Sequence, residues 1–183
     1  MGSIKEKKLA TKNGKEIMIR TAKIKDAPQL RNLVFNVSKE RIYSMVEPEE
    51  FTETVKSNRE RIKRYKDGVG KLYIVTEHNK KITGLVQFDN FYFKKSRHNG
   101  LFTMFIAKPW REKGIGKLMM EEFLAWAKSN PVIEKISLNV FSNNPRAIAL
   151  YKKMGFRQEG LCKRDMKING EYVDSVLMYK FVK

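Results

Sequence analysis

A strand-to-helix junction beyond the middle of the chain carries two closely spaced glycines among basic residues. In "KPWREKGIGKLMM", Gly114 and Gly116 lie just before an apolar pattern with helical spacing. The first backbone N–H groups of a helix have no partner within the helix, so they are free to bind an anion. Glycine allows a close approach of the backbone, and Arg111, Lys113 and Lys117 add positive charge. The stretch therefore predicts a phosphate-binding loop, with a tight turn that binds no ligand as the alternative.

Two well-known phosphate-binding motifs do not fit this stretch. The Walker A motif requires G-x-x-x-x-G-K-[ST], but Arg111 occupies the position of its first glycine and Leu118 that of the magnesium-binding hydroxyl. The dinucleotide motif G-x-G-x-x-G requires a third glycine, and Met119 stands there. ATP hydrolysis and NAD binding are therefore not expected.

The composition supplies few residues for metal or thiol chemistry. The 183 residues include one cysteine, Cys162, and two histidines, His78 and His98. An internal disulfide is excluded, no metal-ligand cluster is expected, and Cys162 is interpreted as structural. No apolar run reaches the ~18 residues that span a bilayer, and charges occupy the N-terminal stretch where a signal peptide is apolar. We therefore expect a cytoplasmic protein without a membrane partner.

The chain is strongly basic, with 38 Lys and Arg residues against 20 Asp and Glu residues and a formal net charge of +18. A surplus of this size favours a polyanionic partner. The lysines are nevertheless scattered singly along the sequence, which is typical of a solvated surface. The charge alone leaves three interpretations open: a lysine-rich surface, an anionic cofactor or a nucleic acid.

The first third of the chain predicts a hairpin followed by two helices. Asn13-Gly14 is a hairpin signal ahead of a short strand over Glu16–Arg20. Asp26 is a candidate N-cap of an amphipathic helix with Pro28 in its first turn. A second helix is expected to begin in "EPEEFTETV" and to end in "DGVG". The residues expected near its first turn and on its apolar stripe are Pro48, Phe51, Val55, Ile62 and Tyr65.

The rest of the chain predicts three strands and then helices that alternate with strands. "KLYIVTE", "KITGLVQFDNFYF" and "LFTMFIA" are rich in β-branched and aromatic residues, so three antiparallel strands fit best. A helix over about Ile115–Ser129 and a strand over Lys135–Phe141 follow. Asn144 is the candidate cap of a further helix, and Asn169-Gly170 joins a last pair of strands. Because no linker or repeat interrupts the pattern, residues 1–183 are expected to form one domain.

The glycine loop resembles the acyl-CoA loop of the GNAT superfamily of N-acetyltransferases. That family's signature, [QR]-x-x-G-x-[GA], is matched by Arg111, Gly114 and Gly116. Further along the chain, "NVFSNNPRAIALYKKMGF" resembles the second conserved block of the family. Its matching positions are Asn144, Ala147, Tyr151, Gly155 and Phe156. Two blocks in the same order are much harder to obtain by chance than one.

This resemblance extends over roughly residues 16–181 and is strongest over residues 101–160. It implies an α/β fold of the α+β type, in which a mixed, mostly antiparallel central sheet is flanked by helices in three α/β/α layers. The tail "NGEYVDSVLMYKF" resembles the branch that acts on amino acids, small amines and protein N-termini. An acyltransferase that uses acetyl-CoA as co-substrate is therefore implied.

The same resemblance implies where acetyl-CoA would bind. In the family it lies along the strand that corresponds to "FTMFIA", in a gap where this strand diverges from the next. The pantetheine arm would be held by the backbone near Met104, Phe105 and Ile106. The pyrophosphate would be held by N–H groups of Arg111, Glu112, Lys113, Gly114, Ile115 and Gly116. Asn144 would contact the cofactor from the second block, although a plain helix N-cap explains this residue equally well.

Tyr151 corresponds to the family's general acid, beside the sulfur that leaves when the amine attacks the thioester. Proton transfer from a tyrosine of pKa about 10 to a thiolate of pKa about 8.5 is uphill by about 2 kcal/mol. A hydrogen bond that stabilises the developing charge is therefore at least as plausible as full transfer. The alternative is an aromatic core residue without a catalytic role.

No general base stands out. Glu47, Glu49, Glu50 and Glu53 fall where the acceptor-side helices of the family would lie, but acids in a first helical turn also complement the helix dipole. His98 is a second candidate, for which a structural hydrogen bond is the simpler interpretation. An α-amino group of pKa about 8 is about one tenth neutral at pH 7, whereas a lysine-like amine is neutral well below about one part in a thousand. An α-amine therefore needs less help from a base.

We expect an enzyme that transfers acetyl from acetyl-CoA to a primary amine of an amino acid, a similar small molecule or a peptide. N-terminal acetylation of a ribosomal or other protein is an alternative. A nucleic-acid- or ribosome-binding module is the rival that the charge suggests, but the sequence lacks an RNA-recognition motif, and this rival leaves the two blocks unexplained. A CoA-binding module without catalysis stays open, as does a homodimer.

Overall fold

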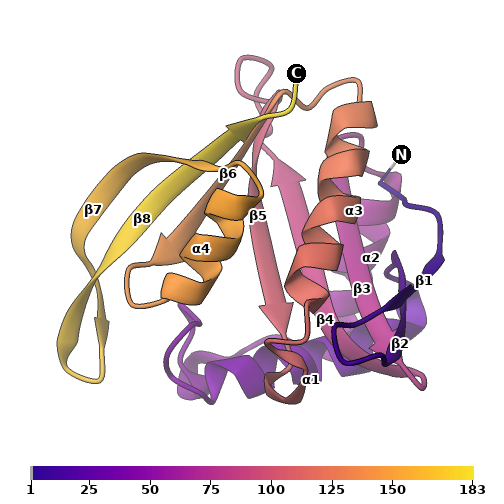
Figure 1. Cartoon of the computed structure of the whole chain (residues 1–183), viewed down its shortest axis with the longest axis horizontal. Helices are drawn as coiled ribbons and strands as arrows, with labels where there is room; N and C mark the ends of the chain where they lie inside the picture. Colours follow the sequence, from indigo (N-terminus) through magenta and orange to yellow (C-terminus); the bar gives the residue numbers. More distant parts are fainter. Residues whose placement is uncertain (1) are drawn as a thin grey trace.

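A mixed eight-stranded sheet runs through the molecule and carries helices on both faces (Figure 1). The computed structural model describes residues 2–183. Within these residues, the strand order is β1-β2-β3-β4-β5-β6-β8-β7, and only β5 and β6 pair in parallel. The strands are β1 (Lys7–Ala10), β2 (Glu16–Thr21), β3 (Lys71–His78), β4 (Lys81–Asn90), β5 (Asn99–Ile106), β6 (Lys135–Phe141), β7 (Arg157–Ile168) and β8 (Glu171–Phe181). The α-helices are α1 (Ala27–Ser38), α2 (Val55–Asp67), α3 (Ile115–Ser129) and α4 (Pro145–Lys153).

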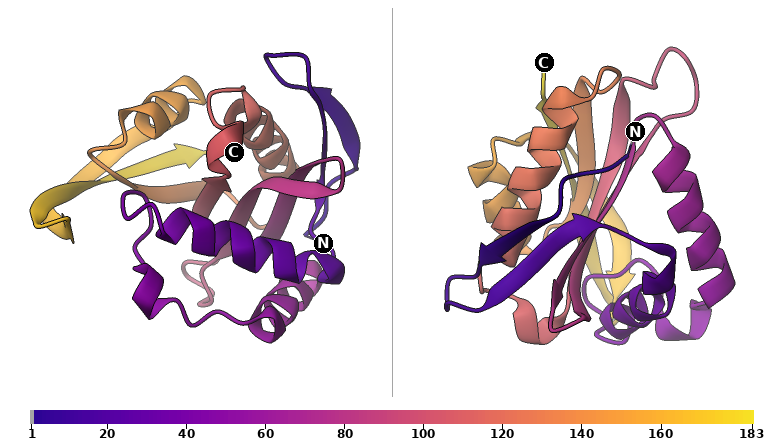
Figure 2. Two further views of the ribbon diagram at one scale, coloured as in Figure 1. Left: turned by 90° about the horizontal axis from the view of Figure 1, so that it is seen from below. Right: turned by 90° about the vertical axis from the view of Figure 1, so that its right-hand side faces the viewer.

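Each face of the sheet has its own hydrophobic core, which produces the three layers seen edge-on in Figure 2. α3 and α4 cover one face, where Phe88, Phe102 and Phe123 are buried. α1 and α2 cover the other face, where Leu30 and Leu85 are buried. β4 serves both cores because successive side chains of a strand point to opposite faces. The predicted α/β fold, a mostly antiparallel sheet between helices, is confirmed.

Most of the predicted turns and boundaries are also confirmed. β1 and β2 form the hairpin signalled by Asn13-Gly14, and Gly14 has a φ of +77°. The bounds of α3 and β6 are the predicted ones. Asn169 and Gly170 both have positive φ between β7 and β8, which suits the twist of a two-residue hairpin loop. These features depend on residues only a few positions apart, which is why the sequence predicts them well.

The second helix begins later than predicted. Pro48–Glu50 forms a separate 3-10 turn (η2), and α2 begins only after Thr54. The Thr54 hydroxyl accepts a hydrogen bond from Ser57 N at 3.0 Å, and Ser57 Oγ accepts one from Thr54 N at 3.0 Å. This reciprocal capping fixes the start of α2. Phe51 therefore leaves the predicted helical stripe and packs on Phe35 of α1, with 5.2 Å between the ring centroids.

Asp26 precedes α1 as predicted, but its carboxylate does not cap that helix. The guanidinium of Arg20 donates to both carboxylate oxygens, at 2.7 and 3.0 Å, and both side chains are buried. Lys23 N donates to the same carboxylate at 2.7 Å. A buried charge needs such partners, so the ion pair takes the carboxylate that the sequence assigned to the cap.

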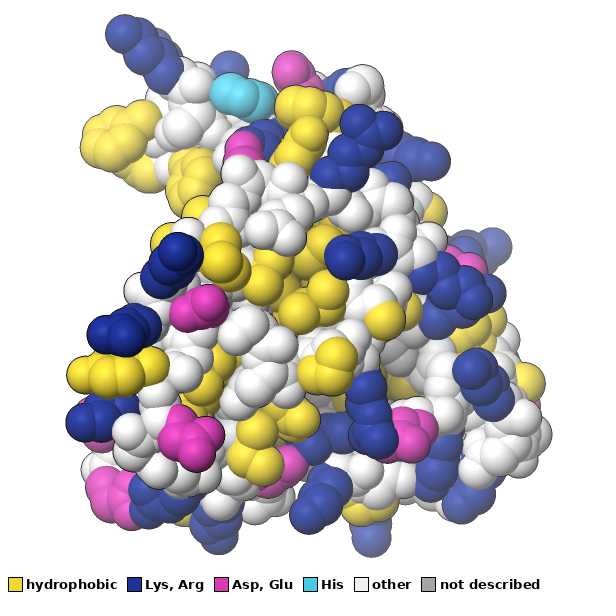
Figure 3. Space-filling view, turned by 60° about the vertical axis from the view of Figure 1, so that its left-hand side comes forward, with side chains coloured by type: hydrophobic (Ala, Val, Ile, Leu, Met, Phe, Trp, Pro, Cys, Tyr) yellow, Lys and Arg dark blue, Asp and Glu magenta, His cyan; other side chains and the backbone are white. Residues whose placement is uncertain are grey.

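Charge is spread widely over the molecular surface. On the face shown in Figure 3, Lys and Arg side chains are distributed around a group of hydrophobic side chains near the middle. Among residues 2–183, no three His, Cys, Asp or Glu side chains are grouped so that they could hold a metal ion. Within the same range, none of the helices has the length and apolar character needed to cross a bilayer. On the face in view, the positive charge is not confined to one patch.

Candidate active site

β5 and β6 run parallel but stay paired over a short stretch only. Residues 99–101 pair with residues 135–137, and no pairing between the two strands continues beyond them in the described part of the chain. Among the described residues, β5 pairs only with β4 from Phe102 onward, and residues 104–106 are half-buried. The two strands diverge from this point (Figure 1). The free edge of β5 therefore offers unpaired backbone groups to an extended ligand that carries amides.

The loop between β5 and α3 presents a run of unpaired backbone N–H groups. Glu112 and Gly114 have φ values of +65° and +83°, and Gly114 is the N-cap of α3. The first N–H that bonds to this cap is that of Leu118, which donates to Gly114 O at 3.2 Å. Within residues 2–183, the N–H groups from Glu112 to Lys117 have no acceptor. Left-handed residues at alternate positions, combined with a helix N-terminus, form a concave anion site.

The two glycines meet different requirements. Gly114 adopts a left-handed φ that is costly for any residue with a Cβ, and a Cβ there would lie 3.0 Å from Lys12 Cγ. Gly116 lies in the first turn of α3, where a Cβ would lie 3.0 Å from Leu150 Cδ2 and 3.3 Å from Ile106 Cδ1. Gly116 therefore lets β5, α3 and α4 pack closely. The sequence suggested an approach to phosphate for both glycines and gave no sign of the contact with Leu150.

Arg111 differs from the expectation for a phosphate ligand. Its backbone N–H donates to Lys108 O at 3.3 Å, so this N–H is not free. Its guanidinium donates to both carboxylate oxygens of Glu40, at 2.6 and 2.7 Å. The charge of Arg111 is thereby neutralised inside the protein. Glu40 lies 71 positions earlier in the chain, and no sequence signal linked it to the loop.

The other charged side chains of the loop also have partners. Lys113 Nζ donates to Pro109 O at 2.5 Å, and Lys117 Nζ lies 3.2 Å from the carboxylate of Glu121 in the next turn of α3. Glu112 forms an exposed ion pair with Arg146 of α4. Anion binding at this loop would therefore depend mainly on backbone N–H groups and less on side-chain charge than the sequence suggested.

Tyr151 lies on α4 beside the point where β5 leaves β6. Its ring packs edge-on against Phe102, with 5.8 Å between the centroids, and contacts Phe156. The residue is 7% exposed, and its hydroxyl forms no hydrogen bond within residues 2–183. Burial raises the pKa of Tyr151, so the hydroxyl stays protonated well into the alkaline range. A hydroxyl in this state can donate a hydrogen bond to a ligand beside β5.

Asn144 is an N-cap in the structure. Its Oδ1 accepts a hydrogen bond from Ala147 N at 3.1 Å, and Pro145 occupies the first position of α4. Gly155 follows the helix with a φ of +84°. The capping bond does not use the side-chain NH₂ group of Asn144, which can still donate a hydrogen bond to a cofactor.

The glutamates that were candidates for a base are engaged with neighbouring groups. Glu47 and Glu49 both pair with Arg41, at 2.7 Å in the case of Glu47. Glu50 accepts a hydrogen bond from the backbone N–H of Glu47 at 3.1 Å, which caps η2. These contacts match the structural interpretation of the acids, although they involve η2 and not the first turn of α2.

Glu53 is held even more firmly than the other three glutamates. Its carboxylate pairs with Arg61 and accepts a hydrogen bond from Asn58 Nδ2 at 3.0 Å. Its backbone carbonyl accepts a hydrogen bond from Arg31 Nε at 2.8 Å. Glu53 thus connects α1 with α2 and has little capacity left for a substrate.

His98 and Cys162 lie away from the divergence of β5 and β6. His98 is exposed at the paired end of β5, and its carbonyl accepts hydrogen bonds from Glu134 N and Lys135 N. Cys162 is half-buried in β7, at the edge of the sheet. A shallow depression between residues 3–7 and α3 also contains no residue of the loop, β5 or α4. The structure therefore brings together β5, the glycine loop and Tyr151, and leaves these other groups apart.

Comparisons with known proteins bear on this arrangement. The sequence profile of the Acetyltransferase (GNAT) family matches residues 39–156. The L-amino acid N-acetyltransferase AaaT of Escherichia coli (strain K12) is 35% identical over 81 residues, which cover 44% of this chain and 50% of AaaT. Spermidine N(1)-acetyltransferase of Vibrio cholerae serotype O1 is 30% identical over 118 residues, which cover 64% of this chain and 66% of that enzyme. The matched stretches thus span between half and two thirds of these relatives.

The comparison of structures extends over more of the chain. The crystal structure of an acetyltransferase of the GNAT family from Streptococcus pneumoniae matches with a TM-score of 0.87 and 27% identity. The match covers 91% of this chain and 99% of that chain. The profile match contains β5, the glycine loop and Tyr151, and it accounts for more than half of the sequence. On these grounds the chain belongs to the GNAT family of acetyltransferases.

Proposed function

We propose that the protein transfers the acetyl group of acetyl-CoA to the α-amino group of an amino acid, a similar small molecule or a peptide. The observation that carries the proposal is an open edge of β5 that leads into a run of unpaired N–H groups. The open edge suits the amides of a pantetheine arm, and the N–H groups suit a pyrophosphate. Acetyl-CoA, when bound, supplies the acetyl thioester.

The residues present fit this co-substrate in most of the expected positions. The backbone of residues 104–106 would hold the pantetheine arm, apart from the Ile106 carbonyl, which already accepts a hydrogen bond from Arg111 Nε at 2.9 Å. The N–H groups from Glu112 to Lys117 would hold the pyrophosphate. Gly116 keeps β5 and α4 close together at this point. Arg111 is not among the proposed phosphate ligands, because its N–H and its guanidinium are already bonded within the protein.

Tyr151 would donate a hydrogen bond to the leaving sulfur as negative charge develops there. Full proton transfer is uphill by about 2 kcal/mol even for a tyrosine of ordinary pKa. Burial raises the pKa of Tyr151, which makes full transfer less favourable still. A donor aimed at charge that exists only in the transition state lowers the barrier without tightening substrate binding. We therefore assign Tyr151 the role of a hydrogen-bond donor to the thiolate.

The ion pairs on the acceptor side support an α-amine over a polyamine. A polyamine carries several ammonium groups, which unpaired carboxylates would bind best. The carboxylates of Glu47, Glu49 and Glu53 already pair with arginines. The α-amine of a peptide also needs little help from a base, because about one tenth of it is neutral at pH 7. Of the relatives compared above, one is named for L-amino acids and one for spermidine, and the pairing of these carboxylates favours the first class.

The test compares kcat/KM for free amino acids, short peptides and spermidine at matched ionic strength, with release of free thiol as the readout. We expect the best α-amine to exceed spermidine. Spermidine exceeding the best α-amine by tenfold would overturn the choice of acceptor. Peptides exceeding free amino acids would shift the assignment to acetylation of protein N-termini. Binding of acetyl-CoA without thiol release from any amine would refute catalysis of this transfer.

A further inference from the structure

Arg111 joins segments that are far apart in the sequence. Its Nε donates to the carbonyl of Ile106, the last residue of β5, at 2.9 Å. Its Nη1 and Nη2 donate to the two carboxylate oxygens of Glu40 at 2.6 and 2.7 Å. The two side chains are 25% and 16% exposed, so solvent screens the pair only in part. A two-pronged contact of this kind fixes orientation as well as distance.

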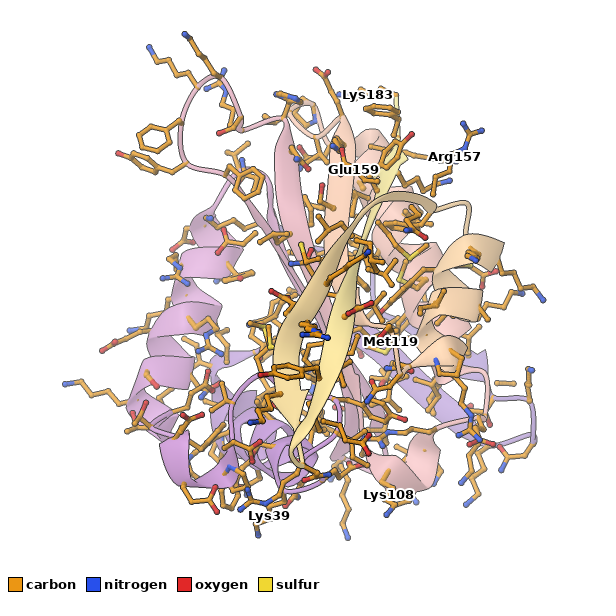
Figure 4. All side chains as sticks on the ribbon, turned by 90° about the vertical axis from the view of Figure 1, so that its left-hand side faces the viewer. Lys39, Lys108, Met119, Arg157, Glu159 and Lys183 are labelled. Atoms are coloured by element: carbon orange, nitrogen blue, oxygen red, sulfur yellow. The ribbon has the colours of Figure 1, made fainter. Side chains whose placement is uncertain are left out.

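Glu40 belongs to the connection between α1 and α2, on the acceptor side of the sheet. The chain turns at Arg41, which has a φ of +52°, and the ring of Tyr43 lies 6.0 Å from the guanidinium of Arg111. Figure 4 shows Lys39 and Lys108, which lie close in sequence to the two partners, at the same end of the molecule. Arg111 therefore connects the start of the acceptor-side connection to the end of the cofactor strand.

We propose that Arg111 and Glu40 are a positioning pair that holds the cofactor loop against the acceptor-side connection. The proposal rests on the proposed function for what each side binds. Breaking a partly buried ion pair leaves a charge without its partner, so the two segments resist separation. A ligand that orders the loop should therefore also order the connection, and the coupling acts equally in the other direction. In this role Arg111 does not touch the phosphates.

The rival interpretation is that Arg111 leaves Glu40 and turns to the pyrophosphate when acetyl-CoA binds. The two interpretations predict opposite changes in the affinity of Glu40→Gln for acetyl-CoA. If Arg111 is a phosphate ligand, neutralising Glu40 frees the guanidinium and tightens the binding of acetyl-CoA. If the pair positions the loop, the same change loosens the loop and weakens binding.

The first measurement is the Kd of acetyl-CoA by calorimetry for the wild type, Glu40→Gln, Arg111→Gln and the double variant. We expect each single change to weaken binding on the order of 10-fold, and the double variant to be no weaker than Arg111→Gln, because both remove one interaction. Arg111→Lys keeps the charge but lacks the planar fork, so it should not restore affinity. Glu53→Gln is the matched control. It loosens the other end of the same connection, at the pair with Arg61, and should change Kd by less than about threefold.

The second measurement is hydrogen exchange of residues 40–46 and 112–117 with and without acetyl-CoA. In the wild type we expect protection of both segments on binding, and in Glu40→Gln protection of the loop alone. Thermal unfolding checks that each variant is folded. The proposal would be overturned by tighter binding of acetyl-CoA to Glu40→Gln or by additive losses of affinity in the double variant. It would also be overturned if acetyl-CoA still protected both segments of Glu40→Gln from exchange. Thiol release by the wild type tests the proposed function separately, so failure of one does not imply failure of the other.

Discussion

The cofactor side and the acceptor side of the site differ in which atoms are left unpaired. Near the glycine loop, the free groups are backbone N–H groups and the open edge of β5. Around the connection between α1 and α2, the charged side chains pair with one another, as Arg41 does with Glu47 and Arg61 does with Glu53. Backbone groups bind a ligand through their arrangement in space, and this arrangement depends on only a few residues. Selectivity for an acceptor depends instead on which side chains are free after the chain has folded.

A similar contrast holds between the net charge of the chain, which comes from side chains, and the anion site, which consists mainly of backbone N–H groups. The chain carries a formal charge of +18, yet Arg111 is neutralised by Glu40, and Lys117 is paired with Glu121. The proposed phosphate contacts depend mainly on backbone dipoles. Net charge determines long-range attraction and solubility, whereas the local arrangement of donors determines where a phosphate binds. The strong basicity of the chain is therefore not needed to explain the proposed phosphate loop.

The largest effect is expected from Gly114→Val, which breaks the cofactor side. Valine strongly disfavours a φ of +83°, so the loop must change shape and its N–H groups lose their common direction. We expect the affinity for acetyl-CoA to fall on the order of 10²-fold or more, measured by calorimetry. Affinity equal to that of the wild type would show that the loop is not the phosphate site.

Gly170→Val is the matched control for this change. Gly170 has a similar φ of +87°, with no other atom within 4 Å of the position its Cβ would take, in the turn between β7 and β8. The substitution introduces comparable backbone strain at a distance from the loop. We expect its affinity for acetyl-CoA to stay within about twofold of the wild type. A loss equal to that of Gly114→Val would attribute both effects to general destabilisation.

The second largest effect is expected from Tyr151, which lies where the cofactor side and the acceptor side meet. If its hydroxyl stabilises the leaving thiolate, Tyr151→Phe should lower kcat on the order of 10–10³-fold with little change in the KM for acetyl-CoA. Tyr73→Phe is the control, because Tyr73 is also buried but belongs to the core on the other face of the sheet. It should leave kcat unchanged. Normal kcat in Tyr151→Phe would assign that residue to packing alone.

The smallest effect is expected from the glutamates of the acceptor side, and it is best seen in the pH profile. If a peptide acceptor supplies its own neutral amine, kcat/KM should rise about tenfold per pH unit below a pKa of about 8 and then level off. Burial raises the pKa of Tyr151, so its protonated form persists to higher pH and should cause no decline below about pH 10. Glu47→Gln should keep this profile, with kcat/KM within about threefold of the wild type. Loss of the rising limb in that variant would identify Glu47 as the base.

Errors in the sequence-based predictions arose where two local signals competed or where a partner was distant. Pro48 and Thr54 are both acceptable start signals for a helix, and the start after Thr54 accompanies the packing of Phe51 on Phe35. Asp26 satisfies the rule for a cap but serves a buried arginine. Neither choice can be made from a short window of sequence, because the competing states differ mainly in contacts with another element.

The sequence by itself determined the order of the elements, the glycine loop with its helix, and the cap of α4 at Asn144. Each depends on backbone preferences or capping contacts within a few residues, as in the bond from Ala147 N to Asn144. The tertiary structure alone decided how far β5 pairs with β6, which side chains crowd Gly116, and where the charge of Arg111 is used. These outcomes depend on atoms brought together from distant positions, such as Glu40 and Arg111. Their energies exist only after the chain has folded, which is why no local pattern in the sequence specifies them.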